Sequence, residues 1–99
     1  MLEEKDLIGS FVEFGPDYRN PGSTGLSHDG IYLTLGTCNM KDSKKGWIEA
    51  VKYTKCKKSY GEWSLLYDEN DPGKYEYIRD KEDFIKKFVK IDNIHLRRP

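Results

Sequence analysis

The sequence predicts a mainly β domain with one short helix near its C-terminus, an α+β arrangement in which the sheet dominates. Two observations support this class. Apolar and polar residues alternate with a period of two along several short segments, which is typical of strands with one buried face. Helical spacing of apolar residues is clear in one place, where Phe84, Ile85 and Phe88 follow Asp80, a residue type that caps helices.

Length and composition indicate one compact unit, so residues 1–99 are interpreted as a single domain. A chain of this size buries roughly 65% of its unfolded surface, which is enough for one core. Hydrophobic residues make up only 36% of the chain and charged residues 34%, but aromatic residues reach 13%. We therefore expect a folded chain whose core is supplied largely by aromatic side chains.

The first half of the chain predicts two strands separated by a long loop. Residues 8–14 alternate, with Val12 and Phe14 on one side and Phe11 on the other. Residues 15–30 contain four glycines and two prolines and almost no aliphatic side chains, so they are expected to form a loop. Residues 30–38 then follow a clean period of two and form the most regular predicted strand.

The second half predicts an antiparallel meander. The polar residues 39–46 turn the chain into a strand at residues 47–55, so a hairpin is expected here. Further strands are predicted at residues 62–67 and 75–79, on either side of a turn at residues 68–74.

The predicted helix begins after Asp80 and extends for about two turns. Acidic residues occupy its first turn and lysines lie toward its other end, which is the charge order that the helix dipole favours. Beyond the helix, Ile94 and Leu96 alternate with His95 and Arg97, and we expect a last strand there.

Five or six short strands, an early long loop and a late short helix predict a small, partly open antiparallel barrel of the SH3-like type. An OB-like barrel is the competing topology. It more naturally carries its helix between the third and fourth strands, whereas the helix of this chain is near the C-terminus.

One segment resembles a sequence pattern of a family of small bacterial and phage domains of unknown function. The pattern is carried by Tyr77, Ile78 and Arg79, followed at the family's spacing by Phe84 and Phe88, and residues 50–53 (Ala-Val-Lys-Tyr) resemble the family's upstream strand. The resemblance spans residues 46–89 and departs from the family at Asp80, where the family has proline. It implies a small β-rich fold.

Charge is balanced overall but arranged in blocks. The formal net charge is zero, which argues against a globally basic nucleic-acid binder. Residues 41–58 nevertheless carry seven basic and two acidic groups, and Lys55, Lys57 and Lys58 are the centre of a possible basic face. The alternative is that neighbouring blocks neutralise one another across strands.

The N-terminus and the cysteines indicate a cytoplasmic protein with free thiols. Residues 1–6 are acidic and no apolar signal segment follows them, while Cys38 and Cys56 lie in separate segments. No run approaches the roughly 18 to 20 apolar residues that span a bilayer, so a membrane role is not expected.

The chain offers no motif for a metal or cofactor, and none is predicted. His28, Cys38, Cys56 and His95 are suitable zinc ligands by type, but they occur singly rather than in the close pairs of structural zinc sites. Residues 68–73 superficially resemble a calcium loop, but Pro72 occupies a position that needs an oxygen ligand.

Catalysis is also not predicted. Ser27, His28 and Asp29 are adjacent in sequence, and adjacent side chains diverge, so the trio is interpreted as turn chemistry rather than a catalytic triad. The chain is therefore interpreted as non-enzymatic.

Binding is the function that the sequence favours. Tyrosines and a tryptophan cluster in residues 53–77, and exposed aromatic faces in small β domains bind peptides or stack bases. The competing interpretation places about half of them in the core. The loop Pro21–Gly25 with Arg19 is a candidate anion site. The predicted binding residues are Tyr18, Arg19, His28, Lys55, Lys57, Lys58, Trp63, Tyr67, Tyr75 and Tyr77.

The sequence thus predicts a small non-enzymatic domain that binds a protein partner, in its most concrete form a phage or mobile-element inhibitor of a host defence complex. The alternative is a nucleic-acid or nucleotide binder that uses the lysine patch and exposed tyrosines.

Overall fold

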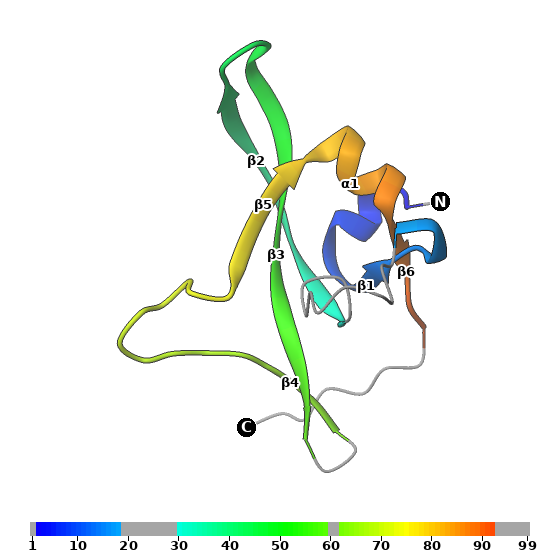
Figure 1. Cartoon of the computed structure of the whole chain (residues 1–99), viewed down its shortest axis with the longest axis vertical. Helices are drawn as coiled ribbons and strands as arrows, with labels where there is room; N and C mark the ends of the chain where they lie inside the picture. Colours follow the sequence, from blue (N-terminus) through cyan, green and yellow to red (C-terminus); the bar gives the residue numbers. More distant parts are fainter. Residues whose placement is uncertain (1, 19–29, 60–61, 93–99) are drawn as a thin grey trace.

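The computed structural model describes residues 2–18, 30–59 and 62–92, apart from the side chains of residues 58, 59, 62 and 63. Within these residues the chain forms six strands, one α-helix and two short 3-10 helices (Figure 1). In chain order they are η1 (Glu4–Leu7), β1 (Ile8–Phe14), η2 (Pro16–Tyr18), β2 (Tyr32–Asp42), β3 (Gly46–Ser59), β4 (Glu62–Leu65), β5 (Glu76–Asp80), α1 (Lys81–Lys87) and β6 (Phe88–Lys90).

All six strands belong to one antiparallel sheet with the order β4-β3-β2-β1-β6, and β5 also pairs with β3. β3 is long enough, at 14 residues, to pair with β5 along its middle part and with β4 at its end (Figure 1). The predicted mainly β class with one short helix near the C-terminus is confirmed. The sheet is not closed into a barrel, because β6 lies at one end of the strand order and β4 and β5 at the other.

The predicted hairpin is confirmed and is longer than expected. β2 and β3 pair from Tyr32 opposite Lys55 to Asp42 opposite Gly46. The Asp42 carboxylate accepts the turn amides of Lys44 (2.8 Å) and Lys45 (3.0 Å), and Gly46 has a φ of +78°, which glycine adopts without strain. The residue types of the turn therefore explain where the chain reverses.

The strand at 8–14 and the capped helix are also confirmed. The Asp80 side chain accepts the backbone N–H of Asp83 at 3.1 Å and begins α1. The helix ends at Lys87, and Phe88 begins β6, which pairs with β1 rather than continuing the helix. The strand predicted at residues 94–96 lies outside the described residues.

Two irregularities in the sheet decide which residues face the core. β1 has a bulge between Ile8 and Phe11, next to Gly9 at a φ of +73°, and β2 has one between Thr34 and Gly36. The first bulge places Ile8 on the surface although it shares the period of Val12, and Ile8 is 66% exposed. Strict alternation along β1 is therefore broken at its start.

The core lies on one face of the sheet, under α1 and η1, and is mostly aromatic. Phe84 and Phe88 stack with their ring centroids 4.2 Å apart and are completely buried or nearly so. The core cluster comprises Leu2, Leu7, Val12, Phe14, Tyr32, Val51, Tyr53, Phe84 and Phe88. The expectation that aromatic side chains supply the core is confirmed.

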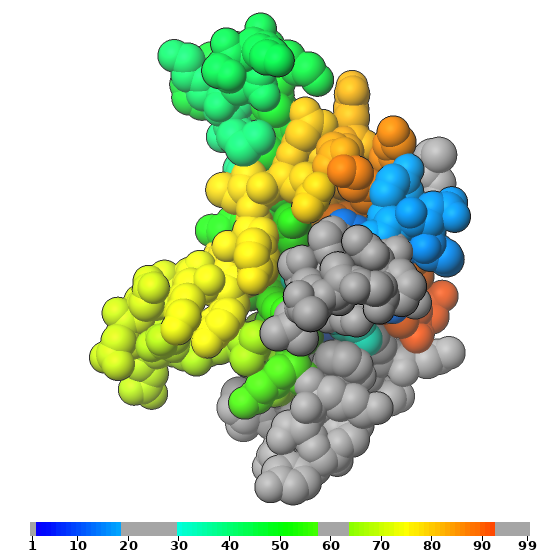
Figure 2. Space-filling model, viewed as in Figure 1, coloured from blue at the N-terminus to red at the C-terminus, as the bar shows by residue number. Residues whose placement is uncertain are grey.

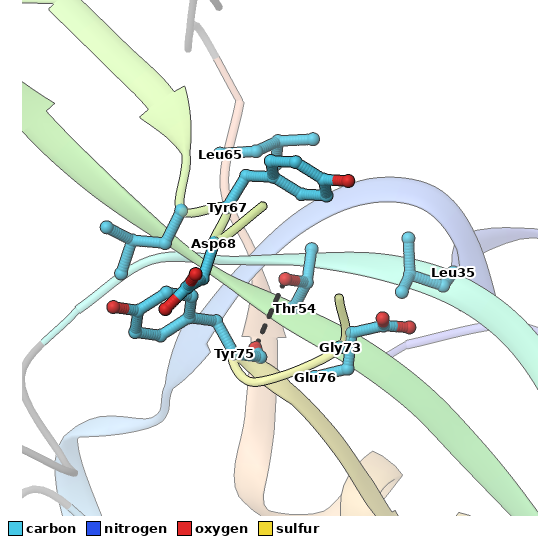
Figure 3. A pocket seen from close by; sticks show the side chains of 9 residues that line it. Leu35, Thr54, Leu65, Tyr67, Asp68, Gly73, Tyr75 and Glu76 are labelled. Atoms are coloured by element: carbon cyan, nitrogen blue, oxygen red, sulfur yellow. Dashed lines mark hydrogen bonds between the residues drawn. The ribbon is translucent and has the colours of Figure 1, made fainter. Parts of the chain in front are cut away.

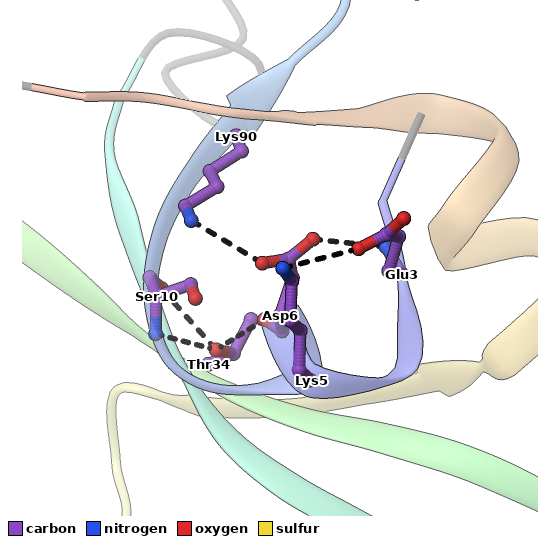
Figure 4. Close-up of polar contacts among 6 residues, drawn as sticks. All are labelled: Glu3, Lys5, Asp6, Ser10, Thr34 and Lys90. Carbon is purple, nitrogen blue, oxygen red and sulfur yellow. Dashed lines mark hydrogen bonds and ion pairs between the residues drawn. The ribbon is translucent and has the colours of Figure 1, made fainter.

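A buried polar group holds the N-terminus to the sheet (Figure 4). The Thr34 hydroxyl accepts the N–H of Ser10 at 2.9 Å and lies 3.0 Å from the Asp6 carbonyl, to which it donates. The Asp6 carboxylate accepts the Glu3 N–H at 2.9 Å and pairs with Lys90 at 3.3 Å. The Glu3 hydrogen bond above all, and Lys90 in addition, lower the pKa of Asp6 against the opposing effect of its burial.

Among the residues that the structure describes, no helix has the length and apolar character needed to cross a membrane.

Candidate functional site

The candidate site is a pocket of about 380 Å³ on the face of the sheet opposite the core (Figure 3). Its walls come from three parts of the chain: β2, β3 and the stretch of residues 65–76, which runs from the end of β4 to the start of β5. The lining residues are Leu35, Thr54, Leu65, Leu66, Tyr67, Asp68, Gly73, Tyr75 and Glu76. Most of them are apolar or aromatic, as is typical of ligand-binding and peptide-binding depressions.

Strand register places the pocket on the outer face. Thr54 and Glu76 are opposite each other across β3 and β5, and the next pair, Tyr53 and Tyr77, points to the core face. The Thr54 hydroxyl donates to the Tyr75 carbonyl at 3.1 Å (Figure 3). This bond satisfies a buried hydroxyl and fixes the start of β5 beside the pocket.

The connecting segment is shaped by local turn chemistry. The Asp68 carboxylate accepts the N–H of Asn70 at 2.9 Å, and Lys74 lies 3.5 Å from the same carboxylate. The Asn70 hydrogen bond is the main cause that lowers the pKa of Asp68, and the Lys74 charge adds to it. Gly73, at a φ of +92°, allows the chain to return into β5.

Large apolar side chains surround the pocket and remain exposed. Tyr67 is 70% exposed, Leu65 is 44% exposed and Leu35 is 36% exposed. Ile8 is opposite Leu35 in the register of β1 and β2, and Ile78 follows Glu76 by two residues on the same face. We call Ile8, Leu35, Leu65, Tyr67 and Ile78 the outer apolar patch. Contiguous apolar surface of this kind is characteristic of interaction sites.

The acidic groups at the rim are already paired. Glu76 lies 2.9 Å from Lys52 and Asp68 pairs with Lys74. Both pairs are partly exposed, so each contributes little to stability, but together they leave the rim close to neutral. The pocket therefore presents an apolar floor with neutralised charges at its edge.

The structure brings two of the predicted binding residues together in this pocket, Tyr67 and Tyr75. Lys55 is adjacent through its backbone: its N–H donates to the Tyr75 carbonyl at 3.1 Å and its carbonyl accepts the N–H of Leu66 at 3.2 Å. Lys57 is exposed further along β3, opposite Ser64 of β4.

Two predicted residues lie away from the pocket. Tyr77 is on the core face, where its ring stacks on Tyr53 with centroids 5.5 Å apart and remains 40% exposed. Tyr18 packs against the core in η2, and its ring lies 6.0 Å from the Lys87 ammonium. Tyr67 and Tyr75 line the pocket whereas Tyr77 lies on the core face, so these three tyrosines divide between the two faces of the sheet.

The remaining predicted residues cannot be placed as side chains. Arg19 and His28, with the candidate anion loop at residues 21–25, lie outside the described residues. Lys58 and Trp63 are opposite each other in the register of β3 and β4, and only their backbone is described.

An Arg79 cluster closes the aromatic core next to Tyr77. Arg79 donates to the Tyr53 hydroxyl at 3.3 Å and to Asp83 at 2.7 Å, and its guanidinium lies 5.5 Å from the centre of the Phe14 ring. Burial acts to lower the pKa of Arg79, but the hydrogen bonds to Tyr53 and Asp83 outweigh it and raise that pKa. Since its donors are engaged within the fold, Arg79 is a structural cation.

The sequence reasoning missed Leu35, Leu65 and Trp47. The aliphatic face of residues 31–35 was visible as a pattern, but the pattern did not show which face is buried. Trp47 is 73% exposed at the end of the β2–β3 hairpin. Its only signal in the sequence was its position next to the turn.

The structure also places the potential metal-ligating and thiol side chains of the described residues. Within the described ranges, no group of three or more His, Cys, Asp or Glu side chains could hold a metal ion. Burial raises the pKa of the Cys56 thiol to about 11, so the thiolate needed for nucleophilic chemistry is scarce at neutral pH. Cys38 is opposite Ala50 and hence about 20 Å from Cys56 along β3, too far for a disulfide between them.

Comparison of the chain with protein-family models, with curated proteins and with solved structures finds no match in any of the three.

Proposed function

We propose that this protein is a non-enzymatic binding domain that engages a protein partner through the outer apolar patch and the pocket within it. The observation that carries the proposal is the distribution of apolar side chains. Phe14, Tyr32, Tyr53, Phe84 and Phe88 fill the inner face, while five large apolar side chains on the outer face are left exposed around a 380 Å³ pocket.

A protein fits this surface better than a small charged ligand. The pocket floor is apolar and the rim carboxylates are paired with lysines, so no unpaired charge in the described rim selects a charged molecule. Tyrosine is enriched in protein-binding hot spots, and the centre of such interfaces is depleted of charged residues. Such a surface buries an apolar side chain of the partner in the pocket and surrounds it with Tyr67 and Leu65.

The concrete form of the proposal is an inhibitor, encoded by a phage or mobile element, of a host defence complex. Its support is the small size of the chain, its balanced charge and a fold that presents a binding face without catalytic machinery. We also propose that the sheet is related to the SH3-like type, although its two edges do not pair to close a barrel. The strand number and the position of α1 support that assignment.

The test is affinity capture of the tagged protein from its native cell, with identification of bound protein, nucleotide and metal. We expect one protein partner in stoichiometric amount. A stoichiometric small ligand with no protein partner is the result that contradicts the proposal.

A matched pair of variants locates the contact. Tyr67→Ala removes an aromatic anchor of the outer apolar patch, and the expected loss of partner affinity is at least tenfold, as is common for an interface tyrosine. Val89→Ala removes an exposed apolar side chain from β6, outside the patch, and should leave capture unchanged. Equal capture by both variants would place the interface elsewhere.

Nucleic-acid or nucleotide binding at Lys55, Lys57 and Lys58 is the weaker alternative. Lys57 is exposed, but Lys55 is half-buried. A steep loss of affinity with added salt is expected if phosphates are bound, and partner binding that is insensitive to salt counts against this alternative.

A further inference from the structure

The β2–β3 hairpin carries an exposed indole at its end. In this hairpin, β1 pairs with β2 only up to Leu35 and β5 pairs with β3 only from Ala50 onward. The distal part, residues 39–42 and 46–49, is therefore a two-stranded ribbon that projects beyond the rest of the sheet (Figures 1 and 2). Trp47 lies on this ribbon opposite Lys41 and is 73% exposed.

An exposed tryptophan needs an explanation in a protein with so few large aliphatic residues. Tryptophan is mostly buried in folded proteins, because its large ring gains much from leaving water. Here the core is built from other aromatic residues, and the indole stands outside it. Folding alone does not account for Trp47 at this place.

Lysines surround the indole. Lys41 is its cross-strand partner, and Lys44 and Lys45 form the turn just beyond it. All three are exposed, and they form no ion pair with another described residue. The one carboxylate of the turn, Asp42, is directed to the amides of Lys44 and Lys45, and these hydrogen bonds lower the pKa of Asp42. The tip thus has three cations and one anion.

The ribbon is held in a fixed position. The Asp42 hydrogen bonds and Gly46 define the turn, and Glu49 at the base of the ribbon is bonded to Lys81 of α1 at 2.6 Å. Preorganisation of this kind reduces the entropy that binding costs.

We propose that the tip formed by Lys41, Lys44, Lys45 and Trp47 binds single-stranded nucleic acid, with one base stacked on the Trp47 ring and the neighbouring phosphates beside the three lysines. An aromatic ring next to a row of cations is the arrangement by which proteins bind single strands without sequence readout. This site is separate from the outer apolar patch and also from Lys55 and Lys57, because residues 48–54 of β3 lie between Trp47 and Lys55 and none of the tip residues belongs to the patch.

Two other polyanions fit the tip less well. A membrane surface requires apolar side chains at the end of the hairpin, but the turn beyond Trp47 consists of Ser43, Lys44 and Lys45. An acidic polypeptide would pair with the lysines. Its carboxylate side chains, however, have no flat aromatic surface to stack on the Trp47 ring, whereas the bases of a nucleic acid do. Stacking is therefore the property that the experiment must isolate.

The test uses the full chain and a fluorescein-labelled twelve-nucleotide deoxythymidine oligomer, with affinity measured by fluorescence anisotropy. The matched probe is an abasic oligomer of the same length, which keeps the phosphates and removes the bases. Polyglutamate serves as the acidic polypeptide probe. Trp47→Ala and Lys44→Ala are compared with Lys86→Ala, which removes an exposed lysine of α1 that is not part of the tip.

We expect the deoxythymidine oligomer to bind at least about tenfold more tightly than the abasic oligomer, since stacking contributes about 1 to 3 kcal/mol per base. Trp47→Ala should remove this difference and leave abasic binding unchanged. The logarithm of the affinity should fall with the logarithm of the salt concentration with a slope of about −2 for three lysines, and Lys44→Ala should reduce the slope by about 0.7. Lys86→Ala should bind as the wild type does.

Several outcomes overturn the proposal. Absence of measurable binding does so directly, and equal affinity for the thymidine and abasic oligomers shows attraction by charge alone. Polyglutamate binding as tight as that of thymidine identifies an acidic polypeptide site instead. An unchanged affinity of Trp47→Ala, with thermal unfolding like the wild type, removes the indole from the site.

Discussion

The two faces of the β3–β5 strand pair differ in the size of the side chains that they bury. On the inner face, Val51 and Tyr53 are buried by Phe84 and Phe88, and Arg79 seals the edge of this aromatic layer. On the outer face, the side chains that are buried are small, namely Ala50, Thr54 and Cys56, whereas Ile78 is exposed. A face that buries small groups and exposes large ones is suited to binding, and a face that buries large groups provides stability.

The largest expected effect is on the inner face. Phe84→Ala removes a fully buried ring that stacks on Phe88, and it should lower the free energy of unfolding by about 3 to 5 kcal/mol. Urea denaturation followed by circular dichroism measures this loss. A loss below about 1 kcal/mol would mean that the aromatic layer is not the stability-determining face.

Thr34→Val tests the buried polar group on the same face. The change keeps the shape but leaves the Ser10 N–H without its acceptor, so the free energy of unfolding should fall by about 1 to 3 kcal/mol. Thr37→Val, at an exposed position of the same strand, is the control and should change it by less than about 0.5 kcal/mol. Similar losses for both variants would point to strand propensity rather than the hydrogen bonds.

The Arg79–Asp83 pair predicts how stability depends on pH. Burial acts to raise the pKa of Asp83, but the bonds to Arg79 and Lys87 outweigh it and lower that pKa from the ordinary 3.8. Because the Asp83 carboxyl has a lower pKa in the folded chain than in the unfolded chain, the unfolded chain binds the proton more readily. The stability that the ionised Asp83 contributes is therefore complete above pH 3.8, and it is lost as the pH falls through the lower pKa of the folded state. Asp83→Asn should flatten the acid limb of a melting-temperature profile, and an unchanged limb would assign it to other carboxylates.

The two cysteines differ in burial, and their rates of alkylation should therefore differ. Cys56 is 2% exposed and burial raises its pKa to about 11, whereas Cys38 is partly exposed. At pH 7.5, iodoacetamide should therefore modify Cys38 first and leave Cys56 unmodified until the protein unfolds, as peptide mass spectrometry can show. Equal rates would indicate that the outer face opens in the native state.

The smallest expected effect on stability comes from the outer face. Leu65→Ala removes a partly exposed side chain from the pocket wall and should change the free energy of unfolding by no more than about 0.5 kcal/mol. Thermal unfolding measures it. A loss comparable to that of Phe84→Ala would show that the pocket belongs to the core and would remove the basis for a binding face.

The sequence predicted local features well, because their causes are local. The cap at Asp80 and the turn at Asp42 depend on side chains within three residues of the groups they bond. The regular period of residues 30–38 likewise predicted β2. The candidate site was predicted only in part, through Tyr67 and Tyr75, because aromatic clustering along the chain does not reveal which strand face each ring occupies.

What the sequence by itself determined is therefore the class of fold, the strand at residues 8–14, a strand at residues 30–38 that the structure extends to Asp42, the helix after Asp80 and the aromatic character of the core. The tertiary structure alone decided that the sheet stays open and that Tyr77 and Tyr67 lie on different faces. It also brought Leu35 to Leu65 and Tyr75 in one pocket. The physical reason is that bulges and strand register are set by pairing between distant segments, and a shift of one residue exchanges the buried face for the exposed one.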